Sequence, residues 1–319
     1  MLINKFKLLT LGALLAVPLC SIALPTLDTD SDQSRLRVDK EPFLILGGEL
    51  GNSTASSLGY MEAVWPKAKA MHLNTLLVPV YWELVEPQEG QFDFSLVRDL
   101  IERARKEDLK LVLLWFGSWK NSMSCYVPSW VKRDSERFPR AQSESGEPQE
   151  ILTPFSPSNL TADRNAFGEL LRFVKKIDGR HHTVLMVQVE NEIGMLPSAR
   201  DHHPLADAAF NSPVPDSLMQ YLVEHREKLE PELRTMWQRN GGRRRGSWAE
   251  IFGSDKAAEE VFTAWHFARY ADAVAAAGKA EYALPMFVNA ALNRPGVAPG
   301  DYPSGGPLPH LMDIWKAGA

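Results

Sequence analysis

The chain has 319 residues, of which 45% are hydrophobic and 24% are charged. This composition is typical of globular proteins, and the length suits one large α/β domain with a substantial core. A net charge of −5 and an isoelectric point near 5.9 give no electrostatic basis for binding nucleic acid or an anionic membrane.

The first 23 residues have the organisation of a secretory signal peptide. Lys5 and Lys7 precede an apolar stretch at 8–19, and Ser21-Ile22-Ala23 fits the small-x-small pattern before a cleavage site. The apolar stretch is too short for a comfortable transmembrane helix. We therefore expect cleavage near Ala23 and a periplasmic or secreted protein that has no membrane attachment after cleavage.

Residues 24–40 are acidic and poor in apolar side chains, which predicts a flexible leader. The remaining residues, 41–319, are expected to form the functional domain. Short apolar runs there predict strands, and apolar residues at i, i+3, i+4 and i+7 predict the helices between them. The predicted strands are Phe43–Gly47, Thr75–Pro79, Lys110–Phe116, Val184–Glu190 and Pro285–Asn289. The predicted helices are Tyr60–Met71, one beginning at Ser95, one across Phe167–Ile177, Ser217–Trp237, Ala257–Ala277 and Leu311–Ala317.

Alternating strands and helices predict a parallel sheet. Their spacing favours an α/β fold of the (β/α)8 TIM-barrel type, with about the first five strand-helix units present. The stretch Gly47-Gly48-Glu49-Leu50-Gly51 follows the first predicted strand, and it is neither a P-loop nor a dinucleotide fingerprint. The sequence therefore favours a barrel over a nucleotide-binding sheet.

Polar and aromatic side chains follow the predicted strands, at the end of a barrel where catalytic residues are mounted. Aromatic faces stack on the C–H surfaces of sugar rings, and carboxylates and amides bond the hydroxyls. Any one tryptophan is more often a core residue, but several of the nine in the chain lie beside acids at strand ends. The candidate sugar-binding residues are Glu49, Trp82, Glu83, Trp119, Asn121, Glu190 and Asn191. Tyr81, Glu86, Trp115, Lys120, Glu192 and Asn289 follow the same predicted strands.

The sequence Gln188-Val189-Glu190-Asn191-Glu192-Ile193-Gly194 is the most informative motif of the chain. It ends a predicted buried strand, where carboxylates and amides are unfavourable unless a partner or substrate satisfies them. Desolvation and a neighbouring carboxylate raise the pKa of a carboxyl group, which suits it to general acid catalysis. An ordinary polar loop would explain one acid, but not this run of acids and amides.

The histidine pairs give weaker signals. His181-His182 precede the fourth predicted strand, at the end of the barrel away from catalysis, and His202-His203 lie in a predicted loop. Neither pair has the i, i+4 helical spacing of a zinc site, so surface positions are expected for them. No metal or organic cofactor is predicted.

The motif at 188–194 resembles the acid/base signature of glycoside hydrolase family 35, the β-galactosidases, within clan A of retaining glycosidases. The resemblance extends to Val80–Pro87, Gly90–Phe94 and Pro285–Asn289, with features similar to family 42. It implies an exported bacterial enzyme that hydrolyses terminal β-D-galactosyl residues of oligo- or polysaccharides with retention.

The resemblance also implies residue roles. Glu192 would be the general acid/base, Asn191 would bond the 2-hydroxyl of the sugar, and Glu190 would line the galactose site. A retaining mechanism needs a second carboxylate, which the family carries on its seventh strand. Nothing after Asn289 predicts a strand ending in Glu, so the nucleophile is expected beyond Ala319. We expect the chain as given to be inactive and poorly stable.

Two alternatives remain open. The first is another clan A β-glycosidase, such as a mannanase or a cellulase, because the clan shares an Asn-Glu pair after its fourth strand. The residues that flank this pair, Gln188-Val189-Glu190 and Ile193-Gly194, favour the galactosidase. The second alternative is a non-catalytic glycan-binding remnant that lacks the nucleophile.

Overall fold

The computed structural model describes residues 23–29, 34–293 and 296–319. The predicted signal segment up to residue 22 lies outside these residues, and its cleavage stays a prediction. Within the described part of the chain, no helix has the length and apolar character needed to cross a membrane.

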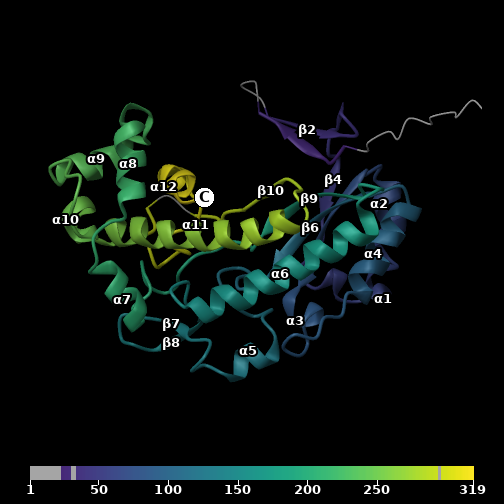
Figure 1. The fold of residues 1–319 in the computed structure, drawn as a ribbon, viewed down its shortest axis with the longest axis horizontal. Helices are drawn as coiled ribbons and strands as arrows, with labels where there is room; N and C mark the ends of the chain where they lie inside the picture. The colour runs from purple at the N-terminus through teal and green to yellow at the C-terminus, as the bar shows by residue number, and fades with distance from the viewer. Residues whose placement is uncertain (1–22, 30–33, 294–295) are drawn as a thin grey trace, which may run out of the picture.

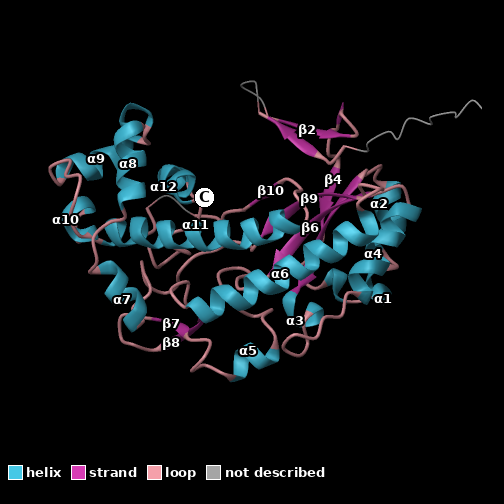
Figure 2. Cartoon of the chain, in the orientation of Figure 1, coloured by secondary structure: helices cyan, strands magenta, loops and turns pink. Residues whose placement is uncertain are grey.

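The centre of the molecule is a five-stranded parallel sheet with the strand order β10-β9-β6-β5-β4 (Figures 1 and 2). Its strands are β4 (Gly47–Glu49), β5 (Thr75–Tyr81), β6 (Lys110–Phe116), β9 (Val184–Val189) and β10 (Met286–Phe287). Each successive strand is added at the same edge of the sheet. The sheet is therefore singly wound, as in a (β/α) barrel, and has no reversal of strand order as in a dinucleotide-binding sheet. This confirms the predicted fold class.

Three long helices connect these strands and pack outside the sheet: α4 (Ser95–Lys106), α6 (Pro157–Asp178) and α11 (Lys256–Glu281). Helices α6 and α11 run side by side (Figure 1). They approach closely at Gly278, where an added Cβ would lie 2.3 Å from Cε1 of Phe167. The α6–α11 contact therefore requires glycine at this position.

Shorter elements complete the fold. The β7–β8 hairpin pairs Arg140–Gln142 with Pro148–Leu152. The predicted helix at 217–237 is interrupted, and Pro231 begins its second part, as expected for a residue that is tolerated only in the first turn of a helix. The other helices are α1 (Leu58–Met61), α2 (Val64–Ala70), α3 (Trp82–Val85), α5 (Ser129–Arg133), α7 (Pro204–Phe210), α8 (Asp216–Glu224), α9 (Pro231–Arg239), α10 (Trp248–Phe252) and α12 (Met312–Gly318).

In place of the flexible leader expected at 24–40, the structure has a three-stranded antiparallel sheet. Leu36 and Val38 alternate along its central strand and pack with Leu185 at the start of β9. This apolar contact holds an otherwise polar segment against the barrel sheet, and local composition gave no sign of it. The strands are β1 (Thr26–Asp28), β2 (Arg35–Val38) and β3 (Glu41–Pro42).

The parallel sheet is open in the described residues. Strands β4 and β10 are its two edges, and they do not pair with each other. Leu44, Leu46 and Leu292, which flank these edges in the sequence, are 75%, 51% and 90% exposed. An open parallel edge leaves backbone groups and apolar surface available to other chains. In the described residues the parallel sheet has five strands, as the sequence predicted.

Candidate active site

The site is organised around the end of β9, where Glu190 and Glu192 adopt left-handed backbone conformations with φ of 59° and 47°. This conformation is uncommon for residues other than glycine and persists only where the surroundings hold it. The Glu192 N–H donates to Oδ1 of Asn289 at 2.8 Å, and the Ser122 hydroxyl donates to the Glu192 carbonyl at 2.6 Å. The chain after β10 and the loop after β6 thus fix the backbone of the predicted acid/base.

Asn191 lies between these two glutamates and is 2% exposed. Its backbone N–H donates to the Trp119 carbonyl at 3.2 Å. Its side-chain Oδ1 is buried and has no hydrogen-bond partner among the described residues. Buried polar atoms are normally paired, so this oxygen lacks the donor that such an atom requires.

Lys120 links three of the predicted site residues. Its side chain is 7% exposed, lies 5.1 Å from the centroid of the Phe116 ring and donates to Oδ1 of Asn121. Burial lowers the pKa of Lys120, and the nearby carboxylates of Glu192 and Glu49 act in the opposite direction. A buried cation therefore lies close to carboxylates from the ends of β4 and β9.

The two predicted tryptophan platforms are core residues instead. Trp82 and Trp119 are both 0% exposed. The Trp82 indole donates to Oε2 of Glu86 at 2.8 Å, and Trp119 packs edge-on against Phe267 and Tyr270. In this structure neither ring offers a face to a sugar, which corrects the sugar-stacking prediction for both residues.

The side chain of Glu83 points away from the cluster around Glu192, toward α5. Its carboxylate pairs with the Lys132 ammonium of α5 at 3.3 Å, and its backbone N–H donates to the Tyr126 carbonyl. Charge pairing with α5 thus satisfies this acid without a substrate. Of the predicted residues, Asn191 and Glu192 lie against the loop that contains Asn121, and Glu83 lies against α5.

Glu190 does not line an open sugar site, contrary to the expectation. It is 0% exposed, and its Oε2 accepts the Trp119 N–H at 2.7 Å. Burial raises the pKa of Glu190 well above its usual range, and the neighbouring Asp163 carboxyl raises it further. This side chain points into the protein, below the site.

Sequence reasoning missed Asp163. It is fully buried on α6, where its Oδ1 accepts the Trp115 indole N–H at 2.9 Å and its Oδ2 accepts the Ser118 N–H at 3.1 Å. One signal was present: Asp163 precedes the apolar position Phe167 by four residues and therefore lies on the buried stripe of the helix. A carboxylate on such a stripe needs a partner inside the fold.

The histidines differ in their placement. His182 was expected at the surface but is 1% exposed, and its Nδ1 lies 3.0 Å from Oδ1 of Asp39 beside the start of β9. His202 is partly buried, and burial lowers its pKa. Within residues 23–29, 34–293 and 296–319, no group of three or more His, Cys, Asp or Glu side chains is arranged to hold a metal ion.

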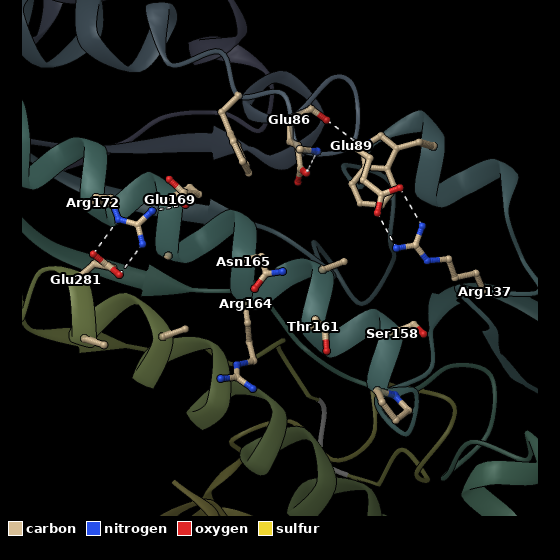
Figure 3. A pocket seen from close by; sticks show the side chains of 18 residues that line it. Glu86, Glu89, Arg137, Ser158, Thr161, Arg164, Asn165, Glu169, Arg172 and Glu281 are labelled. Atoms are coloured by element: carbon tan, nitrogen blue, oxygen red, sulfur yellow. Dashed lines mark hydrogen bonds and ion pairs between the residues drawn. The ribbon is translucent and has the colours of Figure 1, made fainter.

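A cavity of about 730 Å³ lies apart from this site, on the outer face of α6 (Figure 3). Ion pairs flank it: Arg137 with Glu89 at 2.6 Å, and Arg172 with Glu281 at 2.7 Å. None of its lining residues belongs to the cluster around Glu192. The candidate active site is therefore the cluster at the strand ends.

A singly wound β/α sheet with an Asn-Glu pair after its fourth strand is the arrangement of a clan A glycosidase. The family model described as "Beta-galactosidase", of glycoside hydrolase family 42, matches residues 62–271. The chain belongs to this β-galactosidase family. The more specific assignment to family 35 is not supported by the match, and the coarser resemblance to clan A β-galactosidases is confirmed.

Two curated relatives are 27% identical to this chain. A β-galactosidase from Xanthomonas manihotis aligns over 208 residues, which is 62% of this chain and 32% of the relative. β-Galactosidase-1-like protein 3 from Homo sapiens aligns over 201 residues, 60% of this chain and 28% of the relative. The chain thus spans less than a third of the length of each of these relatives.

Solved structures of similar shape include two β-galactosidases. The enzyme from Rahnella sp. R3 has a TM-score of 0.49 and 15% identity, and the match covers 77% of this chain and 35% of that one. The enzyme from the psychrophilic Marinomonas ef1 has a TM-score of 0.49 and 12% identity, with 77% and 37% covered.

Proposed function

We propose that this protein contributes to a retaining glycoside hydrolase that removes terminal β-D-galactosyl residues from oligo- or polysaccharides, with Glu192 as the general acid/base. The observation that carries this proposal is the fixed left-handed turn at the end of β9. It presents Glu192 at the carboxyl end of the strand, in a chain that belongs to a β-galactosidase family.

In this mechanism Glu192 protonates the glycosidic oxygen as the bond breaks, and it later takes a proton from the attacking water. The unpaired Oδ1 of Asn191 accepts a hydrogen bond from a sugar hydroxyl, as the resemblance implies for the 2-hydroxyl. Lys120 and Glu49 provide further polar contacts at the same sheet edge. No cofactor is proposed.

The second carboxylate is the missing part of this site. A retaining enzyme needs it roughly 5–5.5 Å from the acid/base. After Asn289 the described residues contain two carboxylates, and neither follows a strand. Asp313 is buried against the Glu230 N–H at 2.6 Å, and Asp301 lies in an exposed turn. We propose that the described residues after Asn289 do not supply the nucleophile.

The test is replacement of Glu192 by Gln in a form of the enzyme that hydrolyses aryl β-galactosides. We expect rates on poor leaving groups to fall roughly 10²–10⁴-fold, with a smaller loss on activated leaving groups. Azide should restore the deglycosylation step, where the missing base is otherwise required. Glu89→Gln is the matched control, because Glu89 is exposed and paired with Arg137 outside the site. Unchanged hydrolysis by Glu192→Gln would remove Glu192 from the mechanism.

The same assay separates the alternatives. Faster turnover of β-galactosides than of the gluco and manno analogues supports the proposal. The reverse order places the enzyme with another clan A activity, such as a mannanase or a cellulase. Binding of galactosides without any turnover by the complete protein would indicate a glycan-binding remnant.

We also propose that the protein is periplasmic or secreted. The proposal rests on the order of Lys5 and Lys7, the apolar stretch and Ser21-Ile22-Ala23. N-terminal sequencing of the mature protein should begin near Leu24. Recovery of intact Met1 in the cytoplasm would contradict it.

A further inference from the structure

Two buried carboxyl groups lie near each other below the candidate active site. Glu190, at the end of β9, and Asp163, on α6, are both 0% exposed. The two carboxyl groups are close enough for the charge of Asp163 to act on Glu190. Both carboxyl groups also lie beside Gly117, since an added Cβ there would be 2.8 Å from Oε1 of Glu190 and 2.8 Å from Oδ1 of Asp163. Glycine at 117 leaves the space that the pair occupies.

Strand β6, the loop after it and helix α11 place polar groups against this pair of carboxyls. The loop after β6 supplies the Ser118 and Trp119 N–H groups, and β6 supplies the Trp115 indole. Helix α11 supplies Tyr270, whose hydroxyl lies 3.4 Å from Oδ2 of Asp163 and 2.8 Å from the Ser118 hydroxyl.

Neither carboxyl group forms an ion pair with a Lys, Arg or His side chain in the part of the chain that the structure describes. Two ionised carboxylates that are buried near each other without a paired cation repel each other strongly.

The hydrogen bonds show where a proton is needed. Asp163 accepts from the Trp115 indole, the Ser118 N–H and the Tyr270 hydroxyl, so donors surround both of its oxygens. Glu190 accepts the Trp119 N–H on Oε2, and its Oε1 has no hydrogen-bond partner among the described residues. A proton on Oε1 would satisfy that atom, because it could then be donated to Asp163.

We propose that Glu190 and Asp163 share one proton, carried on Glu190, and that this neutral acid–carboxylate pair positions the turn that presents Asn191 and Glu192. Burial, which raises the pKa of Glu190, acts in the same direction. Glu190 is held to α6 through Asp163 and to the loop after β6 through Trp119, so the pair fixes the backbone just before Glu192. The positioning role rests on the proposed function, whereas the shared proton does not.

Infrared spectroscopy of the full chain at neutral pH tests the shared proton without any substitution. A protonated carboxyl band should be present, and labelling with ¹³C-Glu should shift it. The Glu86→Gln variant should keep the band, which excludes the other buried glutamate whose pKa is raised by burial. Absence of the band, its loss in Glu86→Gln, or a shift with ¹³C-Asp in place of ¹³C-Glu would overturn the proposal.

Thermal unfolding between pH 5 and pH 9 gives a second readout. The folded-state pKa of Glu190 is raised, so its contribution to stability is present below its unfolded-state pKa and is lost as the pH rises toward the folded value. Glu190→Gln keeps a neutral donor at every pH. The Tm of Glu190→Gln minus the Tm of the unsubstituted chain should therefore increase with pH. The same difference for the exposed control Glu89→Gln should stay constant over this range. A constant difference for Glu190→Gln would contradict the shared proton.

Activity separates the positioning role from the proposed function. In a form of the enzyme that hydrolyses galactosides, Glu190→Ala should lower kcat roughly 10²-fold, as misplacement of a catalytic group does, with little change in KM. Glu190→Gln should restore most of kcat. Equal losses in both variants would refute positioning by a neutral donor. If the infrared band is present but the complete protein hydrolyses no galactoside, the proposed function fails and the shared proton stands.

Discussion

Replacing Asn289 by Ala removes the acceptor that holds the backbone of Glu192. The Glu192 N–H donates to Oδ1 of Asn289 at 2.8 Å in a partly buried position. Leaving such a donor unpaired costs about 1–3 kcal/mol. The conversion for domains of 150–250 residues is about 2–4 °C per kcal/mol, so we expect the melting temperature to fall by several degrees. The left-handed turn at Glu192 should also relax, because its tie to the chain after β10 is lost.

Differential scanning calorimetry of the full chain measures this effect, with two comparison variants. Asn289→Asp retains an acceptor oxygen and should recover most of the melting temperature. Asn293→Ala changes an exposed asparagine in the same segment and should leave the melting temperature within about 1 °C of the unsubstituted chain, as surface substitutions do. Equal melting temperatures for Asn289→Ala and Asn293→Ala would show that this hydrogen bond does not hold the turn.

Three further predictions concern packing, pH and activity. Gly278→Ala should destabilise the chain by roughly 1–3 kcal/mol, as overpacking does, because the new Cβ meets Phe167 at 2.3 Å. Gly59→Ala, whose Cβ finds nothing closer than 3.9 Å, is the control, and equal denaturation midpoints would contradict the reasoning. The hydrogen bond that the His310 ring donates to Glu260 raises the pKa of His310, so its stabilisation is present below the unfolded-state pKa and is lost as pH rises through the folded value. His310→Gln should therefore lower the melting temperature more at pH 5 than at pH 9, and the reverse order would refute this. Finally, the 319-residue chain should not release aryl groups from β-galactosides, and measurable turnover would place a second carboxylate within it.

The local sequence pattern predicted the ends of a strand correctly where polar residues interrupt the apolar run on both sides. The apolar run Lys110–Phe116 was predicted with both of its ends correct. The strand predicted at Val184–Glu190 ends one residue earlier, because the left-handed backbone of Glu190 leaves the ladder. The first strand was predicted at 43–47 and lies at 47–49. The Phe43 N–H donates to the Leu36 carbonyl instead, and that partner could not be known from local sequence.

The candidate site was predictable in part for the same reason. Glu192 and Asn191 follow a strand whose end is visible in the sequence, so their placement at the sheet edge could be inferred. Trp82 packs against Trp130 and Trp119 packs against Tyr270, partners from other elements that local sequence does not reveal, and both proved to be core residues. Asp163 was missed because its carboxyl partner comes from another strand-helix unit.

The small sheet at the beginning of the chain constrains the order in which the molecule can assemble. Its Leu36 and Val38 are made early in synthesis, but their partner Leu185 is made much later. Until β9 has been synthesised, Phe43 and Ile45 are the only residues of this cluster that these two side chains can contact. Contacts between residues so far apart in sequence form late, because the loop between them must close first. Docking of β2 should thus mark a late step of folding, and a nascent chain stalled before Val184 should leave β1–β3 accessible to proteases.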